Sequence, residues 1–322
     1  MIHIIGGAGF IGTRLTKVLE NAGRDYQVFD KTLEETRFCD VTDPSSLAHI
    51  PPADVMINLA AEHRDDVTPR SLYVDVNVEG ARNVCNVCRE KQIQTIVFTS
   101  SVAVYGFAPE GTGENGRYNP FNDYGRTKMQ AEAVYREWLS ENPEKRSLVI
   151  IRPTVIFGEQ NRGNVYNLLR QIATKRFIMF GPGTNQKSMA YVQNIAEFIV
   201  FSTTLGAGEH IYNYIDKPDL DMNTLVTRCR SVLFGRANVG LRLPGWLGLM
   251  IGYIFDVLAI FTGRKLPVSS IRVKKFMGGT AFNTSVSSTG FVPSCGLEEG
   301  IDRTLQYEFL EDNGCERQFY SE

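Results

Sequence analysis

Apolar residues gather in short runs that alternate with longer segments of mixed polarity through the first half of the chain. The runs lie at residues 2–5, 26–29, 54–59, 95–99 and 148–151. Between two of them, residues 69–90 repeat apolar positions at helical spacing, and residues 15–19 mark a shorter helix near the start. Strands separated by helices in this way predict an α/β fold with a doubly wound parallel sheet.

The regularity weakens after Arg152. Gly and Asn become frequent, and helical patterns return at 192–203, 222–233 and 297–309. We predict a nucleotide-binding domain over residues 1–152, completed by returning segments of the second half, and a smaller C-terminal substrate lobe over residues 153–322. Such a lobe would close over the carboxyl edge of the sheet, where folds of this kind bind ligands.

Composition narrows the possible functions. The chain has 322 residues, of which 43% are apolar and 22% charged, and its 34 basic and 36 acidic residues give a net charge of −2. These values are typical of a soluble globular protein, and they predict no basic surface for nucleic acid. The first residues already form a strand without a charged and apolar leader, which predicts a cytoplasmic protein.

The histidines and cysteines predict no metal site. The four histidines show no ligand spacing, and the six cysteines are scattered. Cys85 and Cys88 form a C-x-x-C pair, but they fall on the apolar positions of a helix. That placement favours buried thiols over redox or metal chemistry.

A glycine-rich turn follows the first apolar run. Gly6, Gly9 and Gly12 form a G-x-x-G-x-x-G motif between a predicted strand and a predicted helix. Residues without a Cβ atom let the backbone approach a pyrophosphate, and a helix N-terminus offers N–H groups to the phosphates. In this context the motif predicts a Rossmann-type dinucleotide site rather than a tight structural turn.

Acidic residues indicate which dinucleotide binds. Asp30 ends the second strand, eighteen residues after Gly12, where a carboxylate accepts hydrogen bonds from ribose hydroxyls and repels a 2′-phosphate. This favours NAD over NADP, although the neighbouring Lys31 would suit the phosphate. Asp40 and Val41, after an expected third strand, are predicted to hold the adenine edge. The alternative for Asp40 is a solvated loop acid.

Tyr124 and Lys128 lie four residues apart at the predicted start of a helix, so both side chains project from one face. A free Tyr has a pKa of about 10. We expect the ammonium of Lys128 to lower that pKa, so that Tyr124 exchanges protons with an alcohol. Ser101 follows the run at 95–99 and should emerge at the same sheet edge, where its hydroxyl would bind a substrate oxygen.

Three motifs resemble those of a known family. The strings Gly6–Gly12 (GGAGFIG), Ser100–Gly106 (SSVAVYG) and Tyr124–Lys128 (YGRTK) are similar to those of extended short-chain dehydrogenases/reductases, in the group of NAD-dependent epimerases and dehydratases. The resemblance covers essentially the whole chain. It implies an NAD-dependent enzyme in which Tyr124 is the base and acid, Lys128 bridges the nicotinamide ribose, and Ser101 bonds the reacting oxygen.

The resemblance also implies binding residues and a partner. Asn77 matches the Asn that props the active site, and helices over 78–91 and 123–140 are expected to pair in a homodimer. The predicted cofactor-binding residues are Gly6, Gly9, Phe10, Ile11, Gly12, Asp30, Asp40, Val41, Ala60, Ala61, Asn77, Lys128 and Pro153. The predicted substrate-binding residues are Ser101, Val102, Asn164, Lys187 and Arg272.

Further strings resemble one branch of this family; they lie at 60–67, 160–169, 187–192, 214–220 and 302–309. That branch inverts C4 of N-acetylglucosaminyl-diphospho-undecaprenol through a 4-keto intermediate, for O-antigen and lipopolysaccharide biosynthesis. It implies a lipid-linked diphosphosugar as substrate. The alternatives are a UDP-N-acetylhexosamine 4-epimerase, a related sugar-nucleotide reductase, and a non-catalytic dinucleotide-binding scaffold. Val102 and Ala103 stand where a dehydratase often has an acidic pair, which disfavours dehydration.

Several polar positions leave the carrier of the sugar open. Lys187 stands where the family more often has Arg, and Val155 where sugar-nucleotide enzymes commonly have Asn. Both departures weaken the case for a UDP-sugar. His63 and Arg64 either line the sugar site or belong to a polar loop, and Arg162 is either a phosphate contact or a solvated charge.

Residues 244–261 are the most apolar segment of the chain. The segment is nearly long enough to span a membrane, but Asp256 and three glycines argue against spanning. Two interpretations remain. The segment is either a helix buried in the second lobe, or an exposed apolar surface that lets the protein lie on the inner face of the cell membrane and reach a polyprenyl chain.

Overall fold

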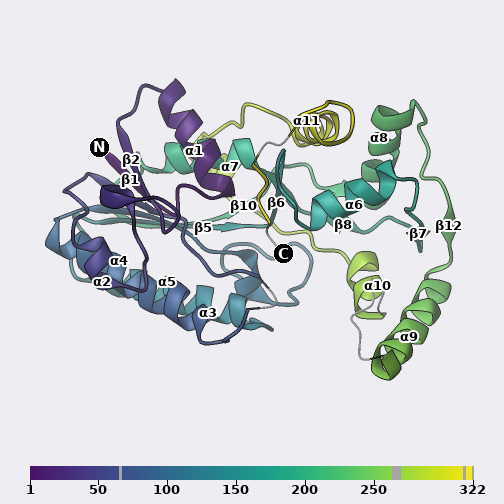
Figure 1. The fold of residues 1–322 in the computed structure, drawn as a ribbon, viewed down its shortest axis with the longest axis horizontal. Coiled ribbons are helices and arrows are strands. Elements are labelled where there is room, and N and C mark those ends of the chain that lie inside the picture. The colour runs from purple at the N-terminus through teal and green to yellow at the C-terminus, as the bar shows by residue number, and fades with distance from the viewer. Residues whose placement is uncertain (65–66, 263–269, 315–316, 321–322) are drawn as a thin grey trace.

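The computed structural model describes residues 1–64, 67–262, 270–314 and 317–320 (Figure 1). A six-stranded parallel sheet with the order β10-β5-β4-β3-β1-β2 lies at its centre. The strands are β1 (Ile2–Ile5), β2 (Tyr26–Phe29), β3 (Val55–Asn58), β4 (Thr95–Thr99), β5 (Ser147–Pro153) and β10 (Gly208–Tyr214). Every residue of β1, β3 and β5 is buried, as expected for strands covered on both faces. The predicted α/β class is confirmed.

Helices cover both faces of this sheet. Figure 1 shows α1 (Phe10–Asn21) and α7 (Val192–Ser202) above it, and α4 (Gly80–Glu90) and α5 (Asp123–Ser140) below it. The predicted helix over 69–90 begins with α3 (Leu72–Val74) and passes through a π-helical turn (Asp75–Glu79) before α4. Apolar side chains fill both interfaces, with Leu15 and Ile199 in one core and Val84 and Trp138 in the other.

The sheet differs from the prediction in two places. The strand β10 pairs with β5 from Gly208 opposite Ser147 to Tyr214 opposite Pro153. Its sequence GEHIYNY has no apolar run, because most of its residues are only partly buried at the sheet edge. The expected third strand before Asp40 is wrong. There the chain forms a 3-10 turn (Glu35–Arg37) and a single bridge between Asp30 and Phe38.

A second group of helices lies beyond the carboxyl edge of the sheet. It comprises α6 (Asn164–Ala173), α8 (Met222–Phe234) and α11 (Leu297–Phe309) around a core that includes Leu169, Val226 and Ile301. Short strands connect them: β6 (Val155–Phe157) pairs with β9 (Met189–Tyr191), β7 (Met179–Phe180) with β12 (Arg242–Leu243), and β8 (Gln186–Lys187) with β11 (Leu220–Asp221). The remaining short elements are α2 (Pro44–Leu47) and the 3-10 turns Val102–Tyr105 and Val286–Thr289.

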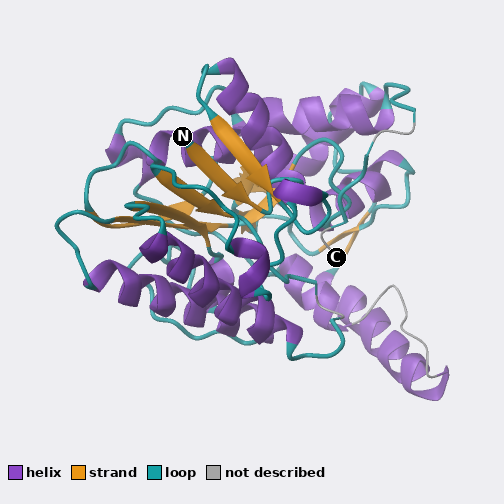
Figure 2. Ribbon diagram, turned by 60° about the vertical axis from the view of Figure 1, so that its left-hand side comes forward, coloured by secondary structure: helices purple, strands orange, loops and turns teal. Residues whose placement is uncertain are grey.

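The apolar segment predicted at 244–261 forms α9 (Gly245–Thr262), which packs against α10 (Ser270–Met277). This pair, the α9–α10 arm, projects from the body of the molecule (Figures 1 and 2). Trp246 is 67% exposed and Phe261 83% exposed, so the interpretation of a buried helix is wrong. In the part of the chain that the structure describes, no helix has the length and apolarity needed to cross a membrane.

Candidate active site

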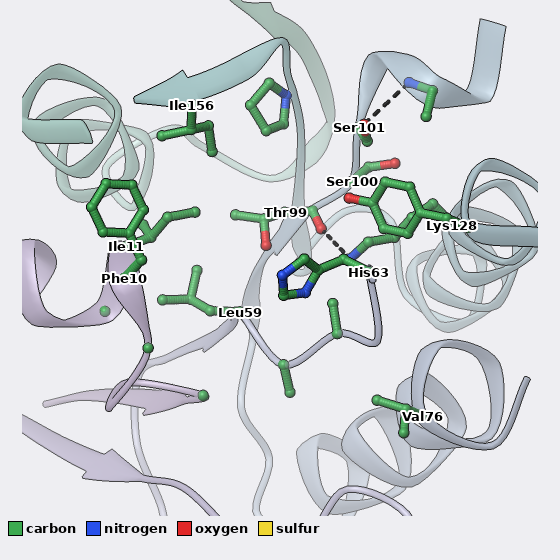
Figure 3. Close-up of a pocket in the computed structure, with 18 of the residues that line it drawn as sticks. Phe10, Ile11, Leu59, His63, Val76, Thr99, Ser100, Ser101, Lys128 and Ile156 are labelled. Carbon is green, nitrogen blue, oxygen red and sulfur yellow. Dashed lines mark hydrogen bonds between the residues drawn. The ribbon is translucent and has the colours of Figure 1, made fainter. Parts of the chain in front are cut away.

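A cavity of about 660 Å³ opens at the carboxyl ends of β1, β3 and β4 (Figure 3). Most of the predicted site residues line it, which brings segments from both halves of the sequence together. Those lining residues are Gly6, Gly9, Phe10, Ile11, Gly12, Asp30, Asp40, Val41, Ala60, Ala61, Ser101, Val102, Tyr124, Lys128, Pro153 and Asn164. The cavity therefore runs from the glycine turn to the Tyr-Lys group.

The glycine turn is closely packed against its surroundings. Gly6 has a φ of +77°, and a Cβ atom there would lie 2.7 Å from the backbone nitrogen of Ala60. A Cβ atom on Gly12 would lie 2.4 Å from the carbonyl oxygen of Gly7. The helix α1 begins at Phe10, so the N–H groups of its first turn have no partner within the helix. This arrangement fits a pyrophosphate.

Asp30 lies at the end of β2, where the prediction placed it. One carboxylate oxygen accepts a hydrogen bond from the N–H of Ala8 at 3.0 Å, and the other accepts from the N–H and hydroxyl of Thr32, both at 2.9 Å. These bonds fix the carboxylate on the cavity wall. Fixed in this way, it suits the ribose hydroxyls of a dinucleotide, so the residues present fit NAD.

Asp40 and Val41 lie on the same wall. The carboxylate of Asp40 accepts hydrogen bonds from the N–H and hydroxyl of Thr42, at 2.9 and 2.8 Å. The carbonyl of Val41 accepts from the side-chain amide of Asn83 at 2.8 Å. Both residues are therefore held by local contacts beside the cavity, and their contact with adenine stays a prediction.

Tyr124 and Lys128 come from the first turns of α5. The side chain of Asn122 caps this helix by accepting a hydrogen bond from the N–H of Gly125 at 2.9 Å. The ammonium of Lys128 donates to the carbonyl of Thr99 at 2.7 Å and lies 6.0 Å from the centre of the Tyr124 ring. Ser101 follows β4, and its hydroxyl accepts from the N–H of Ala103 at 3.1 Å. The predicted grouping of the three side chains is thus present.

The electrostatics of this group differ from the prediction. Burial raises the pKa of Tyr124, and a hydrogen bond with Ser101 opposes part of that shift. Burial also lowers the pKa of Lys128 to about 7, against the opposing charge of Glu132. The net shift of the Tyr124 pKa is therefore upward, opposite to the lowered pKa that was expected. The physical reason is that removing both groups from water disfavours both charges.

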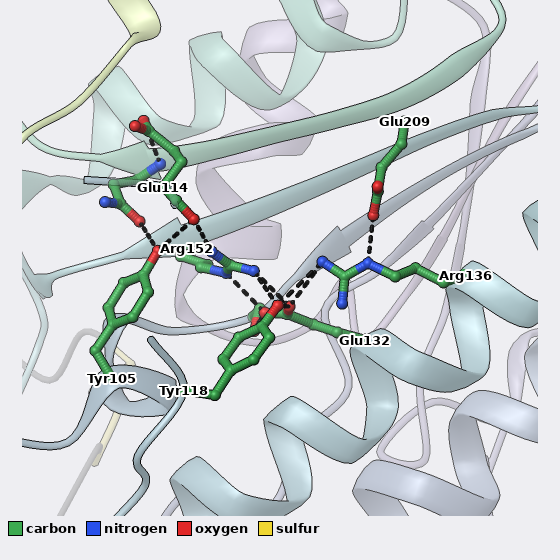
Figure 4. Close-up of polar contacts among 9 residues, drawn as sticks. Tyr105, Glu114, Tyr118, Glu132, Arg136, Arg152 and Glu209 are labelled. Atoms are coloured by element: carbon green, nitrogen blue, oxygen red, sulfur yellow. Dashed lines mark hydrogen bonds and ion pairs between the residues drawn. The ribbon is translucent and has the colours of Figure 1, made fainter. Parts of the chain in front are cut away.

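A buried ion pair lies behind this group (Figure 4). Glu132 and Arg152 are both almost fully buried and 2.7 Å apart. Glu132 also accepts hydrogen bonds from the hydroxyls of Ser100, at 2.5 Å, and Tyr118, at 2.6 Å. Burial would raise the pKa of Glu132, but Arg152 and the hydroxyls of Ser100 and Tyr118 together hold the pKa below its usual value. The pair joins α5 to β5. Through the hydrogen bond of Glu132 with Ser100, it also contacts the segment that carries Ser101.

Asn77 lies outside the cavity wall. Its buried side chain accepts from the N–H of Glu62 at 2.9 Å, and donates to the carbonyl of Glu62 and to the hydroxyl of Thr127, both at 2.9 Å. The structure therefore places Asn77 between the loop after β3 and α5. This position suits the propping function expected of it better than direct contact with a cofactor.

The predicted substrate residues are only partly brought together. Asn164 and Val102 line the cavity, whereas Lys187 does not; its ammonium donates to the carbonyl of Gly278 at 2.5 Å. Burial lowers the pKa of Lys187, against the opposing charge of Glu110. The backbone of Arg272 belongs to α10, but its side chain is outside the described residues.

The alternatives left open for three polar residues are partly resolved. His63 lines the cavity (Figure 3), and burial lowers its pKa. The carbonyl of Arg64 accepts a hydrogen bond from the hydroxyl of Tyr73. Arg162 pairs with Glu308 at 2.8 Å and its side chain is 15% exposed, so it is not a solvated charge, while its contact with a phosphate stays a prediction.

Sequence reasoning missed several polar lining residues. Thr154, Asn161, Ser188 and Thr280 also line the cavity. Ser188 illustrates the difficulty, because its hydroxyl donates to Asp219 at 2.7 Å and accepts from the N–H of Phe282 at 2.9 Å. In the sequence, Asp219 lies 31 residues and Phe282 94 residues from Ser188, so spacing along the chain does not reveal these contacts. Ser188 does lie within the string Lys187–Val192 that carries the family resemblance, and this string is the signal that could have identified it.

Groups suited to a metal ion are not found in the described ranges 1–64, 67–262, 270–314 and 317–320, where no three His, Cys, Asp or Glu side chains converge. Cys85 and Cys88 are buried free thiols, and burial raises the pKa of Cys85 to about 12. They therefore have the character of core residues, as the sequence favoured.

The turn at α1, the acid after β2 and the Tyr-Lys-Ser group at one sheet edge define a class of NAD-dependent enzymes. The chain belongs to the NAD dependent epimerase/dehydratase family, whose model matches residues 2–214. The predicted resemblance is thereby confirmed, and NAD is the cofactor that this family uses.

Individual relatives refine the class. The chain is 50% identical to the N-acetyl-alpha-D-glucosaminyl-diphospho-ditrans,octacis-undecaprenol 4-epimerase of Escherichia coli O157:H7, covering 100% of this chain and 99% of that one. It is 26% identical to the UDP-glucose 4-epimerase of Vibrio cholerae, over 97% and 96% of the two chains. Among solved structures, the UDP-N-acetylglucosamine 4-epimerase of Bacillus cereus superposes with a TM-score of 0.73 at 14% identity, over 97% of this chain and 98% of that one. At that identity the likeness shows the fold alone.

Proposed function

We propose that this protein is an NAD-dependent 4-epimerase that interconverts N-acetylglucosaminyl- and N-acetylgalactosaminyl-diphospho-undecaprenol. The observation that carries the proposal is 50% identity, over the full length of both chains, to a relative with that name. The cavity supports it, because the residues for a dinucleotide and the Tyr-Lys-Ser group share one space. The product would serve O-antigen and lipopolysaccharide biosynthesis.

The reaction inverts an unactivated secondary alcohol. The chemistry that bound NAD supplies is removal of the hydride at C4 and its return to the opposite face. The protein's own task is to bind, to orient and to move one proton. Tyr124 would take the proton of the C4 hydroxyl as the 4-keto sugar forms and give it back in the second half of the reaction.

Ser101 and Lys128 would set the position and charge of Tyr124. The hydrogen bond between Ser101 and Tyr124 favours the phenolate, which burial alone disfavours. A protonated Lys128 would favour it further, and the charge of Glu132 favours that protonated form. Ser101 lines the cavity beside Tyr124 and would hold the reacting oxygen toward it.

The direct test supplies the protein with NAD⁺ and with N-acetylglucosamine carried either on undecaprenyl diphosphate or on UDP. The released sugar is then analysed. We expect N-acetylgalactosamine from the lipid-linked substrate. Conversion of the UDP-sugar alone would instead support a UDP-N-acetylhexosamine 4-epimerase. Steady consumption of reduced cofactor would support a reductase, and no conversion in either arm would support a scaffold.

The variant Tyr124→Phe tests the assignment of the proton-transfer group. Loss of a positioned acid and base should lower the rate by about 10²- to 10⁴-fold, while the affinity for NAD⁺ should change little. The measurements are the initial rate of epimerisation and a binding titration with NAD⁺. A rate within a few-fold of the wild type would refute the assignment of Tyr124.

The same substrate motivates a proposed membrane contact. A polyprenyl chain resides in the bilayer. The α9–α10 arm presents exposed apolar side chains, which are Trp246, Met250, Tyr253, Ile254, Leu258 and Phe261. We propose that this arm rests on the inner face of the cell membrane. We further propose that the enzyme is a homodimer through α4 and α5. Its cofactor domain would comprise residues 1–152 with α7 and β10 of the second half, and most of residues 153–322 would form the substrate lobe.

A further inference from the structure

The C-terminal residues 317–320, here called the C-terminal strap, lie across the loop that follows β6. The N–H of Phe319 donates to the carbonyl of Gln160 at 2.9 Å, and the carbonyl of Phe319 accepts from the N–H of Arg162 at 2.7 Å. The strap thus pairs with both neighbours of Asn161. Figure 1 shows the C-terminal end near the middle of the molecule, between the sheet and the second group of helices.

The side chain of Phe319 reaches the glycine turn. Its ring lies 5.8 Å from the ring of Phe10, centre to centre, at an angle of 46°. Phe10 is the first residue of α1 and lines the cavity. Phe319 is half-buried by these contacts, whereas Tyr320 beside it is 68% exposed. One aromatic residue of the strap is therefore integrated into the fold, and its neighbour is not.

The loop under the strap is held from three directions. Arg14 of α1 donates to the carbonyl of Glu159 and to the side chain of Gln160, both at 3.2 Å. Glu308 of α11 accepts from the N–H of Gln160 at 2.7 Å. Gln160 has a φ of +72°, a conformation that residues other than Gly keep where surrounding contacts enforce it. The strap supplies the third set of contacts.

Both contact points of the strap belong to the cavity wall. Phe10 opens the helix whose first turn faces the pyrophosphate position, and Asn161 lines the same cavity from the other lobe. A dinucleotide held by the glycine turn would therefore be bordered by both residues, and a wider gap between Phe10 and the loop at 159–162 would ease its exit. Contacts from Phe319 to both sides would oppose that widening.

We propose that the C-terminal strap retains the cofactor, with Phe319 as a positioning residue that holds Phe10 and Asn161 around it. The inference rests on the proposed function, because an enzyme that returns the hydride it has removed must keep one cofactor molecule throughout the turnover. The strap acts on release of the cofactor and not on the proton transfer at Tyr124.

The test measures release of NADH, which fluoresces, when the preformed complex is mixed with excess NAD⁺ in a stopped-flow instrument. Phe319→Ala should release NADH about 2- to 10-fold faster than the wild type, the factor expected for loss of one aromatic pair. Phe319→Tyr keeps the ring and should release at the wild-type rate. Tyr320→Ala is the matched control, and it should also behave as the wild type.

A wild-type release rate in Phe319→Ala would overturn the inference, as would equal acceleration in Tyr320→Ala. Circular dichroism and thermal unfolding of the cofactor-free variants verify that they are folded. If Phe319→Ala does not fold, Phe319→Leu replaces it. In that case, NADH release less than twofold faster than in the wild type would refute the proposal. NADH release does not depend on sugar conversion, so failure of the proposed function would leave this result readable.

Discussion

Lys128 is a buried amine, and the charge of Glu132 only partly offsets the cost of burying its positive charge. Its side chain is 2% exposed, and burial lowers its pKa to about 7. The unfolded chain would keep the ordinary lysine pKa of about 10.4. Between these values the unfolded state binds more protons than the folded state, so the contribution of Lys128 to stability rises with pH. Below pH 7 both states are protonated, and the cost of burying the charge is present in full.

We expect Lys128→Met to remove this dependence in the cofactor-free protein. The gain in free energy of unfolding over the wild type should be largest at pH 6 to 7. This gain should shrink by up to about 1.4 kcal/mol per pH unit toward pH 10. The measurement is the free energy of unfolding in urea at several pH values. Lys17→Met is the control, because Lys17 is exposed on α1 and its replacement removes a solvated charge instead of a buried one. A pH-independent difference for Lys128→Met would contradict the argument.

Sequence spacing predicts positions at this scale better than energies. The interval between Tyr124 and Lys128 is sufficient to place both on one face of α5, and both line the cavity. The direction of the pKa shift of Tyr124 could not be predicted, because it depends on how completely water is excluded. The cavity around Tyr124 is completed by segments far apart in the chain, such as those of Thr154 and Phe282.

At the scale of elements, the Glu132–Arg152 pair joins α5 to β5 inside the protein. Removing one member of a buried ion pair leaves the other charge without a partner, which costs about 3–5 kcal/mol. Arg152→Met should therefore lower the free energy of unfolding by that amount. The double variant Glu132→Leu/Arg152→Met should lower it less, because neither charge remains.

Urea unfolding of the two variants measures these differences. The control is Arg303→Met, which breaks the exposed pair of Arg303 with Glu299 on α11. It should cost less than about 1 kcal/mol, because solvent screens exposed pairs. A double variant less stable than Arg152→Met would mean that the hydrogen bonds of Glu132 to Ser100 and Tyr118 stabilise the fold independently of Arg152.

Elements with one strong pattern were predicted from the sequence, and elements with mixed patterns were not. The first strand, at 2–5, and α11, at 297–309, agree with their apolar patterns to the residue. The edge strand β10 was missed because a half-covered strand needs no apolar run. Phe319 was missed for a related reason, since one aromatic residue near a chain end has no periodicity to reveal its contact with Phe10.

At the scale of the whole molecule, the α9–α10 arm projects away from the sheet (Figure 2) and is joined to the second core through Phe276 of α10. Lys274 of α10 lies 5.5 Å from the ring of Tyr253, so a cation accompanies the apolar surface. Apolar side chains with nearby cations are typical of helices that rest on anionic lipid surfaces. The exposed apolar side chains and this cation therefore support the proposed membrane contact through the arm.

Replacing Trp246 and Phe261 by Ser tests this contact. Each large apolar side chain contributes about 1.5–3 kcal/mol when it is transferred from water, so flotation with vesicles containing phosphatidylglycerol should fall at least about tenfold. Val292→Ser is the control, because Val292 is 81% exposed outside the arm. Undiminished flotation of the double variant, or an equal loss in the control, would argue against the arm as the contact.

The edge position of β10 has a consequence for any shortened form of the protein. A chain ending at Arg152 would lack β10 and the last residue of β5, and the rest of β5 would lose its hydrogen-bonding neighbour on that side. Open strand edges recruit strands from other molecules. The first 152 residues made alone should therefore self-associate into insoluble material, and adding the second half in trans during refolding should suppress that precipitation.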